Sequence, residues 1–204
     1  MAKLGVRSML LVVLVLTLAL FQTGSAQAKL TKNQKALMRG GRVTELARSL
    51  TLGSRGWMDK VFRLYSFVRD DIALYQFKEQ KSPAFLLMHR AGLEEDKARL
   101  LSVLMRAVNV KGSLATIHLV KYGEDVTYSF VVIQANRKEA EALSKATGGG
   151  GKFTQFPLGS NKNEFIPLVP LSGYYIGRLS PDFYEVNRSG QWKKWKYYVN
   201  LARF

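Results

Sequence analysis

The sequence predicts an α+β domain in which N-terminal helices pack on a mainly antiparallel sheet. Two observations predict this class. Between residues 54 and 108, apolar residues recur at the spacing of amphipathic helices. From residue 113 onward, β-branched and aromatic residues form short runs separated by turn residues. Helices therefore lead and strands follow along the chain, an order that is typical of α+β folds.

Amphipathic patterns indicate helices in the first half of the domain. The first is expected to begin at Ser54, as N-cap, and to extend over residues 57–72. Pro83 favours the first turn of a short second helix. The next is expected over residues 93–108, because its opening acidic residues suit the positive end of the helix dipole. Lys97 is expected to lie off the apolar face of that helix.

Strand-like runs follow. Residues 113–122 and 126–135 predict a hairpin around the turn Gly123-Glu124-Asp125. Residues 137–146 predict a short helix. The glycine run 148–151 lacks the G-K-[ST] ending and the following helix of a phosphate-binding loop, so it predicts a loose surface joint. Further strands are expected at residues 152–156, 165–169 and 174–179, and in a pair around a turn near Ser189-Gly190.

The start of the chain has the pattern of a cleaved signal peptide, residues 1–28. Lys3 and Arg7 precede an apolar run from residue 9 to 21. Small and polar residues follow the run and end in the A-x-A pattern of residues 26–28. That run is shorter than the ~20 residues needed to cross a bilayer. We therefore expect an exported protein, in a bacterial periplasm or outside the cell.

Two units are expected after the signal peptide. Residues 29–53 form a basic N-terminal arm or short helices, and residues 54–204 form the main domain, which ends in a β-hairpin.

Composition limits the chemistry. The chain has no cysteine, which excludes a thiolate nucleophile, a thiolate metal ligand and a redox pair. Its formal charge of +16 favours an anionic partner, although a generally basic surface explains the same charge. For an exported protein, an anionic envelope component or an acidic protein is expected rather than nucleic acid. Peripheral contact with a membrane or a cell wall fits this charge, whereas the oligomeric state is left open.

Three segments in a characteristic order resemble a known family. Residues 92–101, GLEEDKARLL, match a G-x-C-x-D-x-A-x-L-L helix start. Residues 128–133, YSFVVI, match an H-A-W/F-V-x-V strand, and residues 165–170, FIPLVP, match W/F-x-P-L-D-P. These patterns are typical of the bacterial transglutaminase-like family, and the likeness covers roughly residues 45–171. The resemblance implies a papain-like fold, that of papain-type cysteine enzymes.

The positions that carry the family's chemistry differ in this chain. By the same matches, the family's cysteine becomes Glu94, its histidine becomes Tyr128 and its aspartate becomes Val169. The family's mechanism needs a thiol activated by an imidazole that a carboxylate orients. Loss of all three groups predicts a non-catalytic domain, with the helix kept as scaffold.

Other chemistries have weak support. An acid/base pair of Glu94 with Tyr128 or His118 would give an enzyme with substituted chemistry, a hydrolase or transferase. His89 and His118 are the two histidines, and no HExxH pattern joins them, so neither a metal site nor another cofactor is expected. The chain also lacks the G-x-S-x-G and S-x-x-K patterns of serine enzymes.

A C-terminal run interleaves cations with aromatic rings. It consists of Trp192, Lys193, Lys194, Trp195, Lys196 and Tyr197. Such a run suits binding to an anionic polymer through charge and ring stacking. The alternative is an edge strand whose aromatic residues pack inward and whose lysines discourage pairing with other strands.

Three functions therefore remain in view. The first is an exported, catalytically inactive transglutaminase-like domain that acts as a binding or scaffold module in the cell envelope. The second is the enzyme with substituted chemistry. The third is a structural subunit of an envelope or secretion assembly.

Overall fold

The computed structural model describes residues 29–121, 124–154, 164–179 and 200–203. The expected signal peptide and the run from Trp192 to Tyr197 lie outside the described residues. Within the described part of the chain, no helix is long and apolar enough to cross a membrane.

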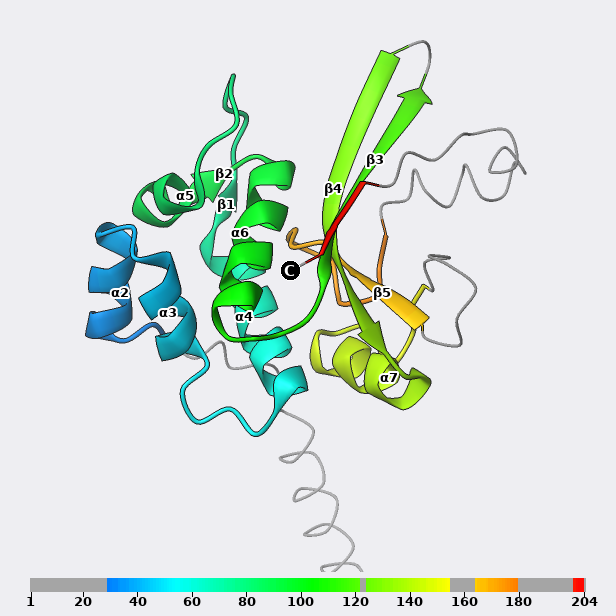
Figure 1. Cartoon of the computed structure of the whole chain (residues 1–204), viewed down its shortest axis with the longest axis horizontal. Helices are drawn as coiled ribbons and strands as arrows, with labels where there is room; N and C mark the ends of the chain where they lie inside the picture. The colour runs from blue at the N-terminus through cyan, green and yellow to red at the C-terminus, as the bar shows by residue number, and fades with distance from the viewer. Residues whose placement is uncertain (1–28, 122–123, 155–163, 180–199, 204) are drawn as a thin grey trace, which may run out of the picture.

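Helices form one layer and a sheet lies beside them (Figure 1). The helices of this layer are α2 (Lys32–Arg39), α3 (Val43–Leu50), α4 (Trp57–Asp71), α5 (Pro83–His89) and α6 (Glu94–Ala107). Helix α6 packs against α3, α4, α5 and strand β4, so it lies at the centre of the helical layer and against the sheet. The observed class is α+β, as the order of patterns predicts.

The main sheet has the strand order β5-β4-β3-β6, and every pair in it is antiparallel. Its strands are β3 (Ser113–Lys121), β4 (Glu124–Ala135), β5 (Glu164–Leu168) and β6 (Asn200–Arg203). Register pairs Ser113 with Val132 and with Arg203, and Val131 with Leu168. A second, two-stranded sheet joins β1 (Ala73–Leu74) to β2 (Ala91–Gly92) in parallel, which the sequence patterns do not reveal.

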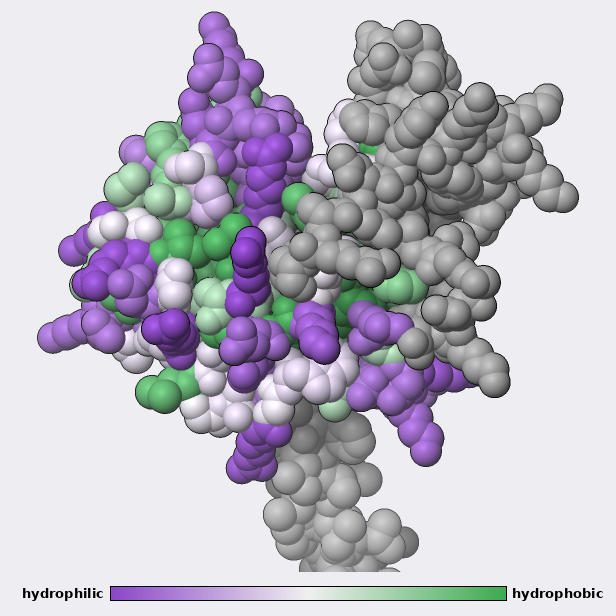
Figure 2. Space-filling model, viewed as in Figure 1, coloured by the Kyte–Doolittle hydropathy of each residue, from purple (hydrophilic) through white to green (hydrophobic). Residues whose placement is uncertain are grey.

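The two faces of the main sheet belong to different apolar clusters. Val131 and Ile133 point toward the helices and pack with the apolar face of α6, including Leu104. Phe130 and Val132 point the other way and pack in a second cluster. This alternation follows from the two-residue period of a strand. On the face shown in Figure 2, hydrophobic side chains gather near the middle, and hydrophilic ones cover the protruding parts.

Local capping explains why the helices begin where they do. At α2, Gln34 N–H donates to Thr31 Oγ1 at 3.2 Å, and Thr31 N–H donates to Gln34 Oε1 at 2.9 Å. The same reciprocal pair forms before α7 (Arg137–Ala146), between Asn136 and Glu139. Helix α5 begins at Pro83, as expected, after the capping hydroxyl of Ser82.

Most expected elements are confirmed: the helices over 57–72, at Pro83, over 93–108 and over 137–146, and the hairpin of β3 and β4. Its expected turn at residues 123–125 is too long, because Glu124 and Asp125 already belong to β4 and pair with β3. Three further expectations about the elements are wrong. Ser54 does not cap α4, because Gly56 occupies the N-cap position, and the Ser54 hydroxyl is buried without a partner among the described residues.

The strand expected at residues 174–179 is instead a series of turns. Gly173 and Gly177 have φ angles of +79° and +94°, and this left-handed backbone interrupts an extended run. Nor do residues 152–154 form a strand; the rest of that expected run lies outside the described residues.

Candidate functional site

Glu94 lies in the first turn of α6, and the carboxylate of Asp96, two residues later, has a structural role. Asp96 is 1% exposed, and its carboxylate accepts hydrogen bonds from Lys81 N–H at 3.0 Å and Leu93 N–H at 3.4 Å. Asp96 therefore satisfies amide donors at the helix start and also fixes the preceding loop. Beside it, Glu95 accepts from Gln80 Nε2 at 2.7 Å, a second attachment of the same loop.

Lys97 lies in the interior, contrary to the expected position off the apolar face. It is 1% exposed, and its Nζ donates to the carbonyl oxygens of Ile72 at 2.6 Å and Arg69 at 3.4 Å. Burial lowers the pKa of Lys97 to about 8, while the charges of Asp70 and Glu94 oppose this shift. The ammonium group thus binds carbonyls at the C-terminal end of α4, where helix carbonyls lack partners.

Tyr128 and Val169 both belong to the neighbourhood of the second apolar cluster. Val169 is 3% exposed in the second apolar cluster, and Tyr128 packs against that cluster. Strand alternation assigns Tyr128 to the face of Phe130 and Val132, whereas α6 packs on the other face. This arrangement gives no support to an acid/base pair of Glu94 with Tyr128.

The residue of this part of β4 that faces the helical side is Ser129. It is 1% exposed, and its hydroxyl lies 3.3 Å from that of Thr116, the residue opposite it on β3. His118 belongs to β3, and its side chain lies outside the described residues. A pairing of His118 with Glu94 therefore stays a prediction.

His89 ends α5 and is exposed, and its ring stacks on that of Phe85 with 4.0 Å between centroids. This contact gives the side chain a packing role. Among the described residues, no three histidine, aspartate or glutamate side chains gather in a way that could hold a metal ion.

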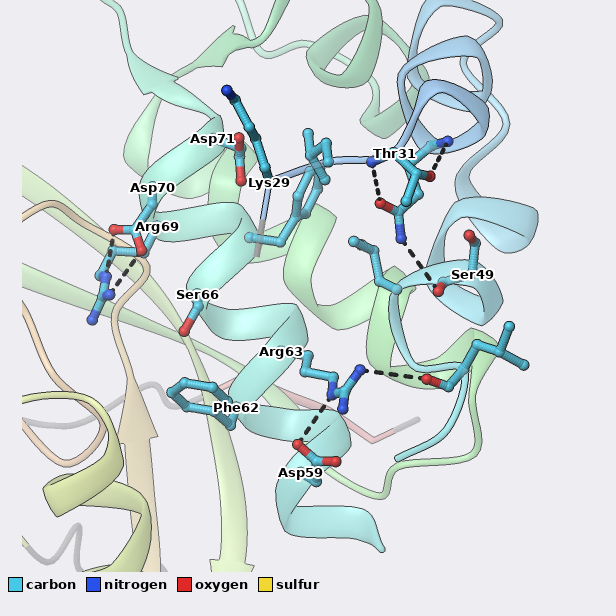
Figure 3. Close-up of a pocket in the computed structure, with 15 residues that line it drawn as sticks. Lys29, Thr31, Ser49, Asp59, Phe62, Arg63, Ser66, Arg69, Asp70 and Asp71 are labelled. Atoms are coloured by element: carbon cyan, nitrogen blue, oxygen red, sulfur yellow. Dashed lines mark hydrogen bonds and ion pairs between the residues drawn. The ribbon is translucent and has the colours of Figure 1, made fainter. Parts of the chain in front are cut away.

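A groove of about 480 Å³ lies between α4 and the ends of α2 and α3 (Figure 3). Sequence reasoning missed it, because its walls come from segments far apart in the chain. Leu30, Leu50, Phe62 and Phe67 give it an apolar part. Ser66, one helical turn after Phe62, contributes a hydroxyl that is buried and has no hydrogen-bond partner among the described residues.

The charged groups along the groove balance one another. Asp59 accepts from Arg63 at 3.1 Å, and Asp70 accepts from Arg69 at 2.6 Å (Figure 3). With Lys29 and Asp71, which also line the groove, the lining contains three basic and three acidic side chains. The spacing of Asp59 and Arg63, four residues apart on a helix, is the signal that indicates one such pair from sequence. The groove therefore differs from the chain as a whole, whose charge is +16.

No family model matches this chain, and no curated protein matches it.

Proposed function

We propose that this chain is an exported, non-catalytic binding module of the cell envelope, with a transglutaminase-like arrangement of helix and sheet and an anionic partner. The observation that carries the proposal is the start of α6. There Asp96 and Lys97 are each 1% exposed and are engaged in hydrogen bonds that join elements of the fold. Both groups are used inside the fold, so this part of the helix start acts as scaffold.

The order of elements supports the resemblance. Helix α6 is followed by the antiparallel strands β3, β4 and β5. Glu94 begins the helix, Tyr128 lies within β4, and Val169 follows β5 directly. A degenerate papain-like domain is consistent with this order of elements. The sheet face of Tyr128, opposite the one that α6 covers, does not support a former site that joined all three residues.

The charge supports an anionic partner. With 31 basic and 15 acidic residues, long-range attraction acts on any polyanion near the protein. The groove is not its source, because its charges balance. An anionic envelope polymer or an acidic protein fits an exported chain of this charge.

A binding experiment separates this proposal from a merely basic surface. Purified protein would be titrated against an anionic glycan polymer and against its neutral counterpart, between 0.01 and 0.15 M salt. Because the Debye length falls from ~30 Å to ~8 Å over this range, affinity for the polyanion should fall steeply. Equal binding to both polymers, or no binding to either, would overturn the anionic-partner proposal.

Catalysis is tested separately. Wild-type protein should show no transglutaminase, peptidase or amidase turnover above a mock purification. Turnover that disappears in Glu94→Gln would instead establish the enzyme with substituted chemistry. A third result, recovery of the protein in a stable complex after cross-linking in intact cells, would favour a structural subunit of an envelope assembly.

The groove favours a second candidate, the binding of a neutral ligand with an apolar body. The specific observation is the buried, unpartnered Ser66 hydroxyl beside apolar side chains. A ligand acceptor or donor there would satisfy that group. A screen of uncharged ligands by thermal shift, repeated on Ser66→Ala, tests this role, because a ligand in the groove should lose affinity in the variant.

A further inference from the structure

The glycine run after α7 forms, with the turns after β5, a depression of about 570 Å³. Its lining consists of Gly148, Gly149, Gly150, Lys152, Tyr175 and Arg178. The sequence predicts a loose joint at these glycines, but the structure shows a loop tied to its surroundings.

Hydrogen bonds fix both sides of this depression. Gly149 N–H donates to Ser144 O at 2.8 Å, and the Ser144 hydroxyl donates to Lys152 O at 2.5 Å. Across the depression, Ile176 N–H donates to the Thr147 hydroxyl at 2.9 Å. Beneath both loops, Arg69 donates to the carbonyl oxygens of Thr147 at 3.4 Å and Tyr174 at 3.3 Å. The two loops are therefore held in one arrangement before any ligand arrives.

Glycine brings the backbone to the surface of the depression. A Cβ on Gly149 would lie 2.3 Å from the Tyr175 ring, so only glycine permits this contact. Gly148 and Gly150 have φ angles of +95° and +62°, and a Cβ on either would meet nothing within 4 Å. Gly148 N–H and Gly149 N–H are already donated within the loop, to Lys145 O at 3.2 Å and Ser144 O at 2.8 Å. Of the three glycines in the lining, only Gly150 has a backbone N–H without a backbone acceptor among the described residues.

The charge of the depression has one sign. Among the described residues, its lining includes Lys152 and Arg178 and no carboxylate. Lys152 is exposed. The Arg178 guanidinium lies 5.0 Å from the ring centroid of Tyr174 and 6.0 Å from that of Tyr175, and it donates to Gly173 O at 2.9 Å. Arg178 is thus oriented by its neighbours, which lowers the entropy lost when it binds an anion.

The C-terminal end of α7 disfavours the binding of an anion, because helix carbonyls carry partial negative charge there. Those carbonyls are already engaged, however. Leu143 O accepts from Thr147 N–H, Ser144 O from Gly149 N–H, and Lys145 O from Gly148 N–H. Two full cations at the rim outweigh the remaining partial charges.

We infer that this depression binds an oxyanion of phosphate or sulfate size through Lys152, Arg178 and the Gly150 amide. The inference rests on the proposed function, because it names the group on the anionic partner that this surface recognises. The open shape of the depression suits an oxyanion displayed at the end or along the side of a larger molecule.

Titration of the purified protein with inorganic phosphate, followed by amide NMR, tests the site directly. Amide signals of Gly148 to Gly150 should shift and saturate, and Lys152→Gln with Arg178→Gln should weaken binding about tenfold, or about 1.4 kcal/mol. Lys32→Gln with Arg39→Gln on α2 removes the same two charges from exposed positions of another element and should leave these shifts unchanged. Equal losses in both double variants would overturn the inference.

Further experiments identify which molecule supplies the oxyanion. They also separate failure of this site from failure of the proposed function. Phosphatidylglycerol vesicles and a phosphate-bearing glycan would each be compared with a phosphate-free counterpart, and the ligand whose binding depends on Lys152 is the source.

If polyanion binding stays salt-dependent but does not change when Lys152 and Arg178 are replaced, the site is wrong and the proposed function stands. If the wild type binds no polyanion, the proposed function fails. Lys152→Glu alone, at an exposed side chain, gives a variant expected to fold, and it should abolish the glycine shifts.

Discussion

The Lys97 ammonium nitrogen lies 2.6 Å from the Ile72 carbonyl oxygen, so a buried cation of α6 closes the C-terminal end of α4. The two residues are 25 positions apart in the chain. This contact joins the helix that resembles a catalytic one to the helix before it, and it has a measurable dependence on pH.

The stability of the fold should rise with pH above about 8. Burial lowers the pKa of Lys97 from 10.5 to about 8, so between these values the unfolded chain binds the proton and the folded chain does not. The penalty for a buried charge is complete below pH 8 and is relieved as pH rises toward 10.5, by roughly 1 to 3 kcal/mol.

Urea unfolding at pH 7.5 and 9.3 would measure this change against Lys97→Met. Burial raises the pKa of Tyr65 above its ordinary value, and this favours unfolding only above pH 10, so both measurements stay below that range. The variant should lack the Lys97 contribution, and an identical pH dependence in both proteins would contradict the assignment.

Asp96→Ala should lower the free energy of unfolding by roughly 1–3 kcal/mol. The substitution leaves the partly buried amides of Lys81 and Leu93 without their carboxylate partner. Glu79→Gln is the matched control, because that side chain is 83% exposed and lies 3.7 Å from Lys81. Chemical denaturation should find the control within about 0.5 kcal/mol of wild type. A similar loss in both variants would show that Asp96 has no special role.

Val169→Asp restores the acid that the transglutaminase-like pattern carries, yet it should destabilise the fold by several kcal/mol. The new carboxylate enters an apolar cluster in which Val169 is 3% exposed. Val169→Ala, which adds no charge, should cost less. Melting temperatures at pH 4.5 and 7.5 decide the cause, because protonation at low pH should relieve part of the loss in the Asp variant only. A pH-independent loss would indicate a packing defect instead.

Gly149→Ala should destabilise the loop after α7 by roughly 1–3 kcal/mol, because its Cβ overlaps the Tyr175 ring. Removing that ring should relieve the clash, so adding Gly149→Ala to Tyr175→Ala should cost less than adding it to wild type. A double-mutant cycle from chemical denaturation measures this coupling. Additive losses would mean that the ring and the glycine do not constrain each other.

Sequence reasoning performed best where the signals are local. The position of Pro83 at the start of α5 and the alternating runs of the hairpin depend on neighbouring residues, and the elements appear where these signals lie. Residues 174–179 have strand-like composition but form turns, because Gly173 and Gly177 adopt left-handed angles that composition does not specify.

The site residues show the same limit. Burial of Lys97 depends on carbonyl groups from α4, and the face of Tyr128 depends on which side of the sheet the helices cover. Both are properties of packing between distant segments. A pattern of spacing could place these residues in elements, but it could not orient them.

Helix α6 contacts α3, α4, α5 and β4, so most routes by which the helical layer opens must separate it from several partners at once. Its central amide hydrogens are therefore expected to exchange with solvent only during global unfolding, whereas α2, at the periphery of the layer, opens separately. The rate of global unfolding would then depend on α6, because its separation from these partners would be required for the core to open.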